Sequence, residues 1–315
     1  MQMLNRTETA AYLLQHDGFA ILTHRRPDGD TLGSAALLCR GLRQLGKQAY
    51  ILENPEITEK YAHLHDGLTK SAAEPTDTLI CVDVASPQML SGAFAHLQDR
   101  ICLRIDHHGS ATSFTEKELV EPLTAACGET VYGVLSAMGV SLDEPMAEAL
   151  YTAISTDTGC FRYANTTADT FRVAADCAAV SKNLFALNQA LFETNSLGRL
   201  RLQGWLVEHA IFLQNGAIVI CPLPKAVEEE LGLTEDDLEN ISGFPRTIEG
   251  VKIAATIRQE DSGRVKVSVR AVPGYDASAI CAQFGGGGHK GAAGASMQMS
   301  MNEAVEAIKA AMPRL

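Results

Sequence analysis

A histidine and two aspartates follow one another closely near the start of the chain. His24 lies at the end of an apolar run, and Asp28 and Asp30 come shortly after it. One imidazole and two carboxylates suit a metal ion of intermediate hardness, such as Mn²⁺ or Zn²⁺. The alternative is helix capping, in which an aspartate accepts bonds from the free N–H groups at a helix start. This stretch alone leaves both interpretations open.

Later segments contain further groups of the same chemistry. They are Asp83, Asp106, His107, His108 and Asp157. Carboxylates that converge on one place repel one another unless they are protonated or bound to metal. Two divalent ions about 3.5–4 Å apart would remove this repulsion and could hold both the nucleophile and the leaving oxygen of a phosphoryl displacement. A carboxylate such as Asp83 can bridge two ions of this kind.

Apolar runs that alternate with helical segments must position these groups. We predict strands at 19–23, 48–52, 78–82 and 101–105. We predict helices at 6–16, 31–45, 127–138, 144–156, 167–181 and 185–193. The alternation predicts an α/β fold with a doubly wound parallel sheet, and sheets of this kind bind ligands at the carboxyl ends of their strands. Three of the runs end in His or Asp, and Arg104 interrupts the last of them.

Near residue 196, the alternation of strands and helices gives way to a long helix and then to a second strand-rich region. We predict a catalytic domain over 1–195 and, over 196–315, a linker helix with a smaller α/β domain. The elements expected there are a helix at 197–213, a strand at 216–221, a helix at 224–241, hairpin strands at 252–257 and 265–269, and helices at 276–283 and 301–312. A glycine loop at 285–294 would let backbone N–H groups approach an anion. Domain interfaces are common ligand sites, so we expect the active site in the cleft between the domains.

Composition restricts the class of protein further. The chain has 315 residues, of which 46% are hydrophobic and 20% charged, and this fits a soluble globular protein. With a formal net charge of −12, the protein lacks the positive surface that is typical of a duplex-DNA binder. None of the eight cysteines forms a C-x-x-C pair, which favours reduced, buried thiols in a cytoplasmic protein. We expect neither a signal peptide nor a membrane span.

These motifs and their order along the chain resemble those of the DHH phosphoesterase superfamily. The matching motifs are His24-x-x-x-Asp28-x-Asp30, Asp83, Asp106-His107-His108 and Asp157-Thr158-Gly159. The segment Gly286-Gly287-Gly288-His289 with Ala292-Ala293-Gly294 resembles the DHHA1 domain of that superfamily. The size and the glycine loop are similar to the nanoRNase and pAp phosphatase branch, where pAp is 3′-phosphoadenosine 5′-phosphate. The resemblance implies a parallel-sheet DHH domain with flanking helices and a smaller α/β DHHA1 domain.

The resemblance also implies a role for each residue. His24, Asp28 and Asp83 would bind one Mn²⁺, and Asp30, Asp83, His107 and Asp157 would bind a second, with Asp83 as the bridge. His108 would contact the scissile phosphate or protonate the leaving group, and Asp106 would orient the imidazoles. Asp83, Asp106 and His108 are therefore the expected catalytic residues. The expected substrate contacts are Arg270, Gly287, Gly288 and His289, with Arg258 a weaker candidate.

The implied activity is Mn²⁺-dependent release of 5′-mononucleotides from short RNA or DNA oligonucleotides, with pAp 3′-phosphatase as a second activity. The alternatives are a phosphodiesterase for linear or cyclic dinucleotides such as pApA and c-di-AMP, and a non-catalytic nucleotide-binding regulator. Ala111 and Ala271 depart from the family pattern, in which Asn and Ser are common, and this affects the expected nucleotide contacts. The sequence leaves open the order of substrates, the metal used in the cell and the oligomeric state, with a homodimer among the states considered.

Overall fold

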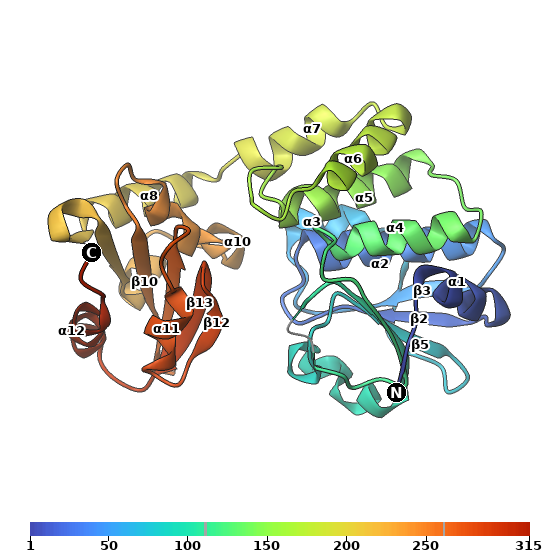
Figure 1. The fold of residues 1–315 in the computed structure, drawn as a ribbon, viewed down its shortest axis with the longest axis horizontal. Coiled ribbons are helices and arrows are strands. Elements are labelled where there is room, and N and C mark those ends of the chain that lie inside the picture. Colours follow the sequence, from blue (N-terminus) through green and yellow to red (C-terminus); the bar gives the residue numbers. More distant parts are fainter. Residues whose placement is uncertain (110–111, 261) are drawn as a thin grey trace. The chain divides into compact units, whose positions relative to one another are not determined.

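The computed structural model describes residues 1–109, 112–260 and 262–315. Ala111 therefore lies outside the described residues. The chain divides into two compact units, Met1–Thr194 and Asn195–Leu315, each with its own core (Figure 1). No helix in the described part of the chain is long and apolar enough to cross a membrane.

The first unit is built on a seven-stranded sheet in which every pairing is parallel. The strand order is β1 (Gln2–Met3), β7 (Lys117–Val120), β6 (Ile101–Asp106), β5 (Thr78–Val82), β2 (Phe19–Leu22), β3 (Ala49–Leu52) and β4 (Thr69–Lys70). The predicted parallel sheet is confirmed, because its four central strands are the four apolar runs. Strands β1, β4 and β7 were not predicted. Strand β7 lacks an apolar run because Glu118 lies inside it, buried opposite Arg104.

Helices cover the sheet of the first unit. They are α1 (Arg6–Gln15), α2 (Gly29–Gln44), α3 (Glu59–Ala62), α4 (Cys127–Ala137), α5 (Glu144–Asp157), α6 (Ala168–Val180) and α7 (Leu184–Asn188), the last continued by a π-helical turn at Gln189–Glu193. Helices α2, α4 and α5 lie on one side of the sheet, and the 3₁₀ segment Gly92–Arg100 lies on the other (Figure 1). Phe94 and Leu97 of that segment pack in the core of the second side.

Two glycines bring helices α2 and α5 unusually close together. A Cβ on Gly29 would lie 2.5 Å from Oγ1 of Thr156, and one on Gly33 would lie 2.4 Å from the carbonyl oxygen of Ala149. Any side chain at these positions would therefore force the helices apart. The close approach places the last residue of α5, Asp157, beside the first turn of α2.

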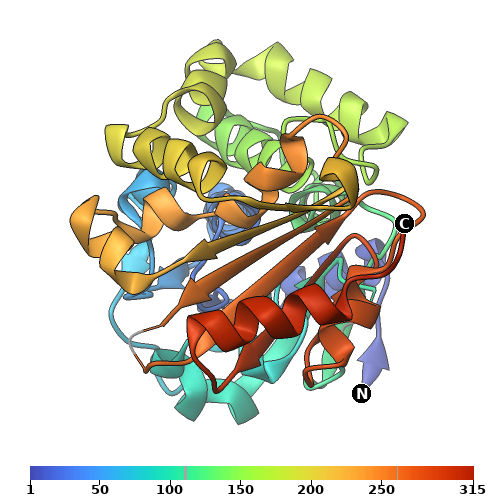
Figure 2. The same ribbon diagram turned by 90° about the vertical axis from the view of Figure 1, so that its left-hand side faces the viewer.

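The second unit contains a six-stranded mixed sheet. The strand order is β12 (Gly287–His289), β13 (Ala292–Met297), β11 (Val265–Ala271), β10 (Ile253–Gln259), β9 (Ile218–Leu223) and β8 (Ile211–Leu213). The helices are α8 (Leu197–Glu208), α9 (Lys225–Glu230), α10 (Glu235–Leu238), α11 (Ala277–Ala282) and α12 (Met301–Ala311). Side chains from α11 and α12 pack on one face of the sheet and those from α8 to α10 on the other. Figure 2 shows α12 lying across the strands.

Three predictions for the second unit were wrong in detail. The predicted helix 197–213 ends at Glu208, and its last residues form β8. The predicted helix 224–241 is divided, because Gly232 adopts a left-handed φ of +60° after α9 and Thr234 caps a new helix. The predicted glycine loop is largely a hairpin of β12 and β13. Gly288 is required there, since its φ is +143° and a Cβ would lie 2.6 Å from the carbonyl oxygen of Ala292.

Candidate metal centre

The acidic and imidazole residues predicted from the sequence gather at the carboxyl edge of the parallel sheet. They come from the ends of β2, β5 and β6, the start of α2 and the end of α5. These residues are His24, Asp28, Asp30, Asp83, Asp106, His107, His108 and Asp157. Within the described residues all of them except Asp106 form three overlapping groups of metal-ligand type, which share Asp83 and His107.

The first group contains His24, Asp28 and Asp83. Nε2 of His24 lies 3.6 Å from Oδ1 of Asp28 and 3.6 Å from Oδ2 of Asp83. Nδ1 of the same ring lies 2.8 Å from the carbonyl oxygen of Arg25. Because a carbonyl oxygen can only accept, Nδ1 carries a proton, and Nε2 is the nitrogen that faces the carboxylates and would bind a metal once it is deprotonated.

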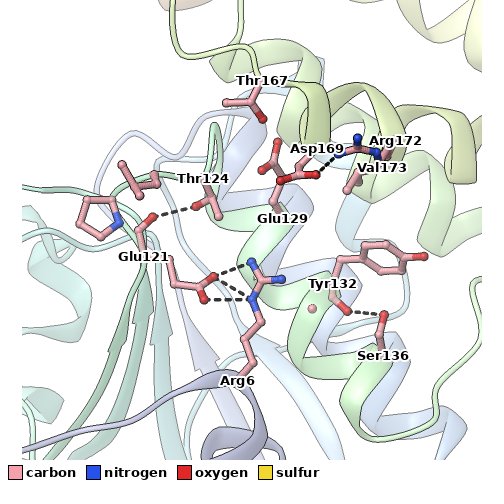
Figure 3. A pocket seen from close by; sticks show the side chains of 13 residues that line it. Arg6, Glu121, Thr124, Glu129, Tyr132, Ser136, Thr167, Asp169, Arg172 and Val173 are labelled. Atoms are coloured by element: carbon pink, nitrogen blue, oxygen red, sulfur yellow. Dashed lines mark hydrogen bonds and ion pairs between the residues drawn. The ribbon is translucent and has the colours of Figure 1, made fainter.

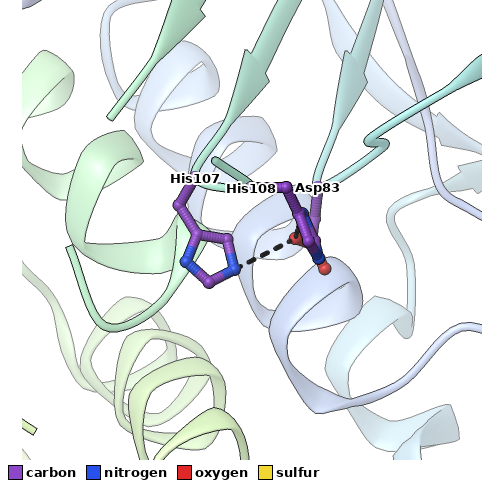
Figure 4. Close-up of side chains that lie close together, drawn as sticks. All are labelled: Asp83, His107 and His108. Atoms are coloured by element: carbon purple, nitrogen blue, oxygen red, sulfur yellow. Dashed lines mark ion pairs between the residues drawn. The ribbon is translucent and has the colours of Figure 1, made fainter. Parts of the chain in front are cut away.

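The second group surrounds His107. Its Nε2 lies 3.6 Å from a carboxylate oxygen of each of Asp30, Asp83 and Asp157. Its Nδ1 donates to the carbonyl oxygen of Thr124 at 3.3 Å. Figure 4 shows the ring of His107 directed at Asp83. The bond to Thr124 fixes the ring with Nε2 directed at the three carboxylates.

The spacing of the donor atoms fits divalent ions. A separation of 3.6 Å is too long for a hydrogen bond, but it suits two atoms that each lie about 2.1 Å from one ion. Oδ1 of Asp83 is buried and has no hydrogen-bond partner within the described residues, which is costly for a carboxylate. Oδ2 of Asp83 faces the first group and Oδ1 faces the second. Asp83 also has a left-handed φ of +59°, a strained conformation that is often found at functional sites.

Asp28 and Asp30 both accept hydrogen bonds from the N–H groups at the start of a helix, and both also lie in the candidate metal site. Oδ1 of Asp28 accepts bonds from the N–H groups of Asp30 and Thr31, at 3.1 and 3.2 Å, so the capping interpretation is confirmed. Asp30 instead accepts from the N–H groups of Cys127 and Gly128 at the start of α4, at 2.7 and 3.0 Å. These bonds fix both carboxylates without removing them from the site.

Burial and mutual repulsion change the protonation of the group. Burial, with repulsion from Asp83 and Asp157, holds the pKa of Asp30 well above its usual value. Burial also raises the pKa of Asp157 to about 7, because His107 offsets the effect only in part. Burial lowers the pKa of His24, but its two carboxylate neighbours outweigh this and raise it well above the usual value. The cluster therefore retains protons near neutral pH, and a bound metal would displace them.

Asp106 orients one imidazole and not both. Its Oδ1 accepts from Nδ1 of His108 at 2.8 Å and from the backbone N–H of His107 at 2.8 Å. The prediction that Asp106 also orients the ring of His107 was wrong, because Thr124 does so. Burial disfavours the charged form of His108, but the bond to Asp106 outweighs it and raises the pKa of His108 to about 9.

Two of the predicted substrate residues, His289 and Arg270, lie at one level of the sheet. His289 on β12 pairs with Ala292 on β13, and Ala292 pairs with Arg270 on β11. Directly paired residues project from the same face, so the small Ala292 lies between His289 and Arg270. Ala271 faces the opposite way into the core, so its departure from the family pattern removes no group from this face.

Arg258 is bound by two carboxylates of the second unit. Its Nε donates to Glu228 at 2.6 Å, and an Nη nitrogen donates to Glu235 at 3.2 Å. These two carboxylates occupy the guanidinium group that the sequence suggested as a weaker phosphate contact. Arg258 is therefore an ion-paired residue of the second unit.

A cavity of about 720 Å³ lies elsewhere in the first unit (Figure 3). None of the predicted site residues lines it. The guanidinium of Arg6 lies within it and is paired with Glu121 at 2.7 Å. Thr124 lines the cavity and its carbonyl oxygen contacts His107, so the cavity lies behind the candidate metal centre.

Two family models match the chain. The DHH family, N-terminal domain, matches residues 18–154, and the DHHA1 domain matches residues 217–313. The first match contains every residue of the candidate metal centre except Asp157. The second contains Arg270 and the segment Gly287–His289.

Several proteins are similar over most of the chain. The bifunctional oligoribonuclease and PAP phosphatase NrnA of Thermus thermophilus is 33% identical over 91% of this chain and 87% of that protein. The protein of the same name from Bacillus subtilis is 25% identical over 93% of each chain. The cyclic-di-AMP phosphodiesterase GdpP of Geobacillus thermodenitrificans is 25% identical over 98% of this chain but only 51% of GdpP.

Solved structures share the fold. An exopolyphosphatase-related protein from Bacteroides fragilis has a TM-score of 0.82 at 22% identity. The match covers 97% of this chain and 95% of that protein. RecJ from Thermus thermophilus, solved in complex with Mn²⁺, has a TM-score of 0.55 at 16% identity, over 97% of this chain and 53% of RecJ.

Proposed function

This chain belongs to the DHH family, and we propose that it is a divalent-metal phosphoesterase that releases 5′-mononucleotides from short oligonucleotides and removes the 3′-phosphate of pAp. The observation that carries this proposal is the position of Asp83, whose two oxygens face two different donor groups. The relatives named as oligoribonuclease and PAP phosphatase supply the substrate class.

We assign the ligands to two ions, with Mn²⁺ as the metal. His24, Asp28 and Asp83 hold one ion, and Asp30, Asp83, His107 and Asp157 hold the other. When bound, ions of this kind activate water and stabilise charge on the phosphoryl oxygens. Oδ1 of Asp83, which has no hydrogen bond within the described residues, and the proton-retaining carboxylates support this assignment, because both features are relieved when a cation binds.

His108 acts on the leaving group in this proposal. Its Nδ1 donates to Asp106, so Nε2 is the nitrogen that can give a proton to the leaving oxygen. Its side chain is 33% exposed, whereas that of Asp106 is fully buried, so the ring has access to a ligand. A pKa of about 9 keeps the ring protonated at neutral pH, as an acid requires.

We assign substrate phosphate binding in the second unit to Arg270 and His289, with the backbone of Gly287 and Gly288. An arginine can contact two phosphate oxygens at once, and exposed glycine N–H groups add donors. Ala292, which pairs with both residues, places only a methyl group between Arg270 and His289. This arrangement favours a substrate that carries a phosphate apart from the one that is cleaved.

A product-resolved time course with added Mn²⁺ tests the proposal. The substrates are a diribonucleotide, pAp, pApA, c-di-AMP and a 24-residue RNA. We expect rapid cleavage of the diribonucleotide and release of phosphate from pAp, with slow or no cleavage of the 24-mer. Selective cleavage of c-di-AMP or pApA would assign a dinucleotide-messenger phosphodiesterase instead, an alternative that the similarity to GdpP keeps open. Tight nucleotide binding without cleavage would indicate a regulator.

A further inference from the structure

A fully buried arginine lies directly behind the candidate metal centre. Arg104 is on β6, two residues before Asp106, and is 1% exposed. Its partner across the sheet is Glu118 on β7, which is 0% exposed. Burying an ion pair is costly and often stabilises a protein no better than apolar residues would. The burial of this pair therefore calls for a role besides stability.

The guanidinium of Arg104 joins three parts of the structure. One Nη nitrogen donates to Glu118 at 2.7 Å. The other lies 3.3 Å from Oδ2 of Asp106 and 3.3 Å from the carbonyl oxygens of both Val84 and Ala85. The first nitrogen therefore anchors the side chain, and the second contacts the neighbours of the site.

All three contacts of the second nitrogen lead to site residues. Asp106 uses its other oxygen to hold Nδ1 of His108. Val84 and Ala85 directly follow Asp83, whose backbone is in the left-handed conformation. Arg104 thus contacts the orienting partner of His108 and the chain that fixes Asp83.

Glu118 connects the same network to the segment after His108. Its Oε1 accepts from the backbone N–H groups of Phe114 and Thr115, at 3.0 and 3.3 Å. Its Oε2 accepts from the hydroxyl of Ser113 as well as from Arg104. Glu118 therefore holds Arg104 and this segment in one arrangement.

We propose that Arg104, anchored by Glu118, is a positioning residue that holds Asp106 and, through it, His108 for proton transfer to the leaving oxygen. The proposal rests on the proposed function. In the step concerned, water attacks phosphorus and releases one proton to solvent, the bond from phosphorus to the leaving oxygen breaks, and Nε2 of His108 gives that oxygen a proton. His108 then takes up a proton from solvent before the next turnover. Lysine cannot replace Arg104 fully, because it lacks the planar fork that contacts Glu118 and Asp106 together.

The test compares two leaving groups in the Mn²⁺-loaded enzyme. A diribonucleotide needs a proton on its leaving oxygen, whereas the p-nitrophenyl ester of a 5′-nucleotide releases p-nitrophenolate without one. We expect Arg104→Met to lower kcat on the diribonucleotide about 100-fold, the size of a general-acid contribution, but kcat on the ester less than about 5-fold. KM should change little on either substrate, because Arg104 contacts no substrate.

Further variants separate positioning from folding. Glu118→Gln keeps the shape of the anchor and should show the same preference for the ester with a smaller loss. Arg104→Lys should recover part of the diribonucleotide activity. Arg172→Met changes an exposed arginine and should leave both activities unchanged. Circular dichroism and Mn²⁺ content show whether each variant folds and loads metal.

The outcomes distinguish this inference from the proposed function. Equal losses of kcat on both substrates in Arg104→Met and Glu118→Gln, or no loss in either variant, would overturn the positioning role. A wild-type enzyme that cleaves neither substrate would overturn the proposed function itself. Selective loss on the diribonucleotide with normal metal content supports both.

Discussion

The candidate metal centre and the predicted substrate face of the second unit differ in almost every physical respect. The first is buried at its middle, with Asp30 1% and Asp83 3% exposed, and is formed by segments far apart in the sequence. The second is an exposed, glycine-rich edge formed by neighbouring strands. Buried ligands are fixed by backbone bonds before any ion binds, whereas the edge strand offers freely accessible donors. Changes in the first region should therefore affect metal binding and kcat, and changes in the second should affect KM.

The largest effect is expected from Asp83→Ala. This substitution removes a ligand from both donor groups, so we expect the rate on a diribonucleotide to fall more than about 1,000-fold and Mn²⁺ to stop raising the melting temperature. The metal-free variant should be no less stable than wild type, because Oδ1 of Asp83 accepts no hydrogen bond from the described residues that the substitution could remove. Asp99→Ala, at an exposed position, is the matched control. Retained Mn²⁺-dependent activity in Asp83→Ala would show that Asp83 is not a shared ligand.

A smaller and different effect is expected from Arg270→Ala. We expect KM to rise about 10- to 100-fold, the range for one charged hydrogen-bonding contact, with little change in kcat or in Mn²⁺ affinity. Steady-state kinetics on a diribonucleotide and on pAp measure this. Lys266→Ala, on the same face of β11, tests for a general effect of positive charge and should change KM little. A loss confined to kcat would show that Arg270 does not act through substrate binding, and so would contradict the assignment of KM to the second region.

The two glycines of β12, Gly287 and Gly288, differ in the space available for a side chain. Gly288→Ala meets the carbonyl oxygen of Ala292 at 2.6 Å, whereas a Cβ on Gly287 has open space. We expect Gly288→Ala to lower the free energy of unfolding by about 1–3 kcal/mol and to raise KM, and Gly287→Ala to stay within about 1 kcal/mol of wild type. Denaturant unfolding and kinetics of both variants provide the measurement. Equal effects would refute the steric explanation.

The smallest effect is a pH dependence in the metal-free protein. The pKa of Asp157 is about 7 in the folded chain and 3.8 as its ordinary value, so the folded state binds more protons between these values. Asp157 therefore reduces stability as pH rises from about 4 to 7, and Asp157→Asn removes this loss. In EDTA, the melting temperature of Asp157→Asn relative to wild type should increase between about pH 5 and pH 7.5. With Mn²⁺ the order should reverse, since the variant lacks a ligand. A constant difference in EDTA would contradict the assignment.

Sequence patterns predicted the parts of the structure that depend on local chemistry. The apolar runs of β5 and β6 and the acids that follow them gave the sheet and one edge of the site. Strand β7 was missed because Glu118 is buried only through its pairing with Arg104, which no local pattern reveals. The carbonyl group of Thr124 that orients His107 was missed because every residue carries such a group.

The close packing of Gly29 was not predicted from the sequence. Gly29 lies inside α2, where a Cβ would meet the side chain of Thr156. Such close packing between distant helices is set by tertiary structure. One signal was visible, because Arg104 interrupts an apolar run immediately before the site.

In the proposed function, Asp83 joins two metal ions in one site. Electron paramagnetic resonance of the protein titrated with Mn²⁺, combined with a count of bound ions per chain, measures this. We predict two Mn²⁺ per chain with the signal of exchange-coupled ions, and a single uncoupled ion in His24→Ala. One ion per wild-type chain, or two ions without coupling, would show that Asp83 does not bridge two ions.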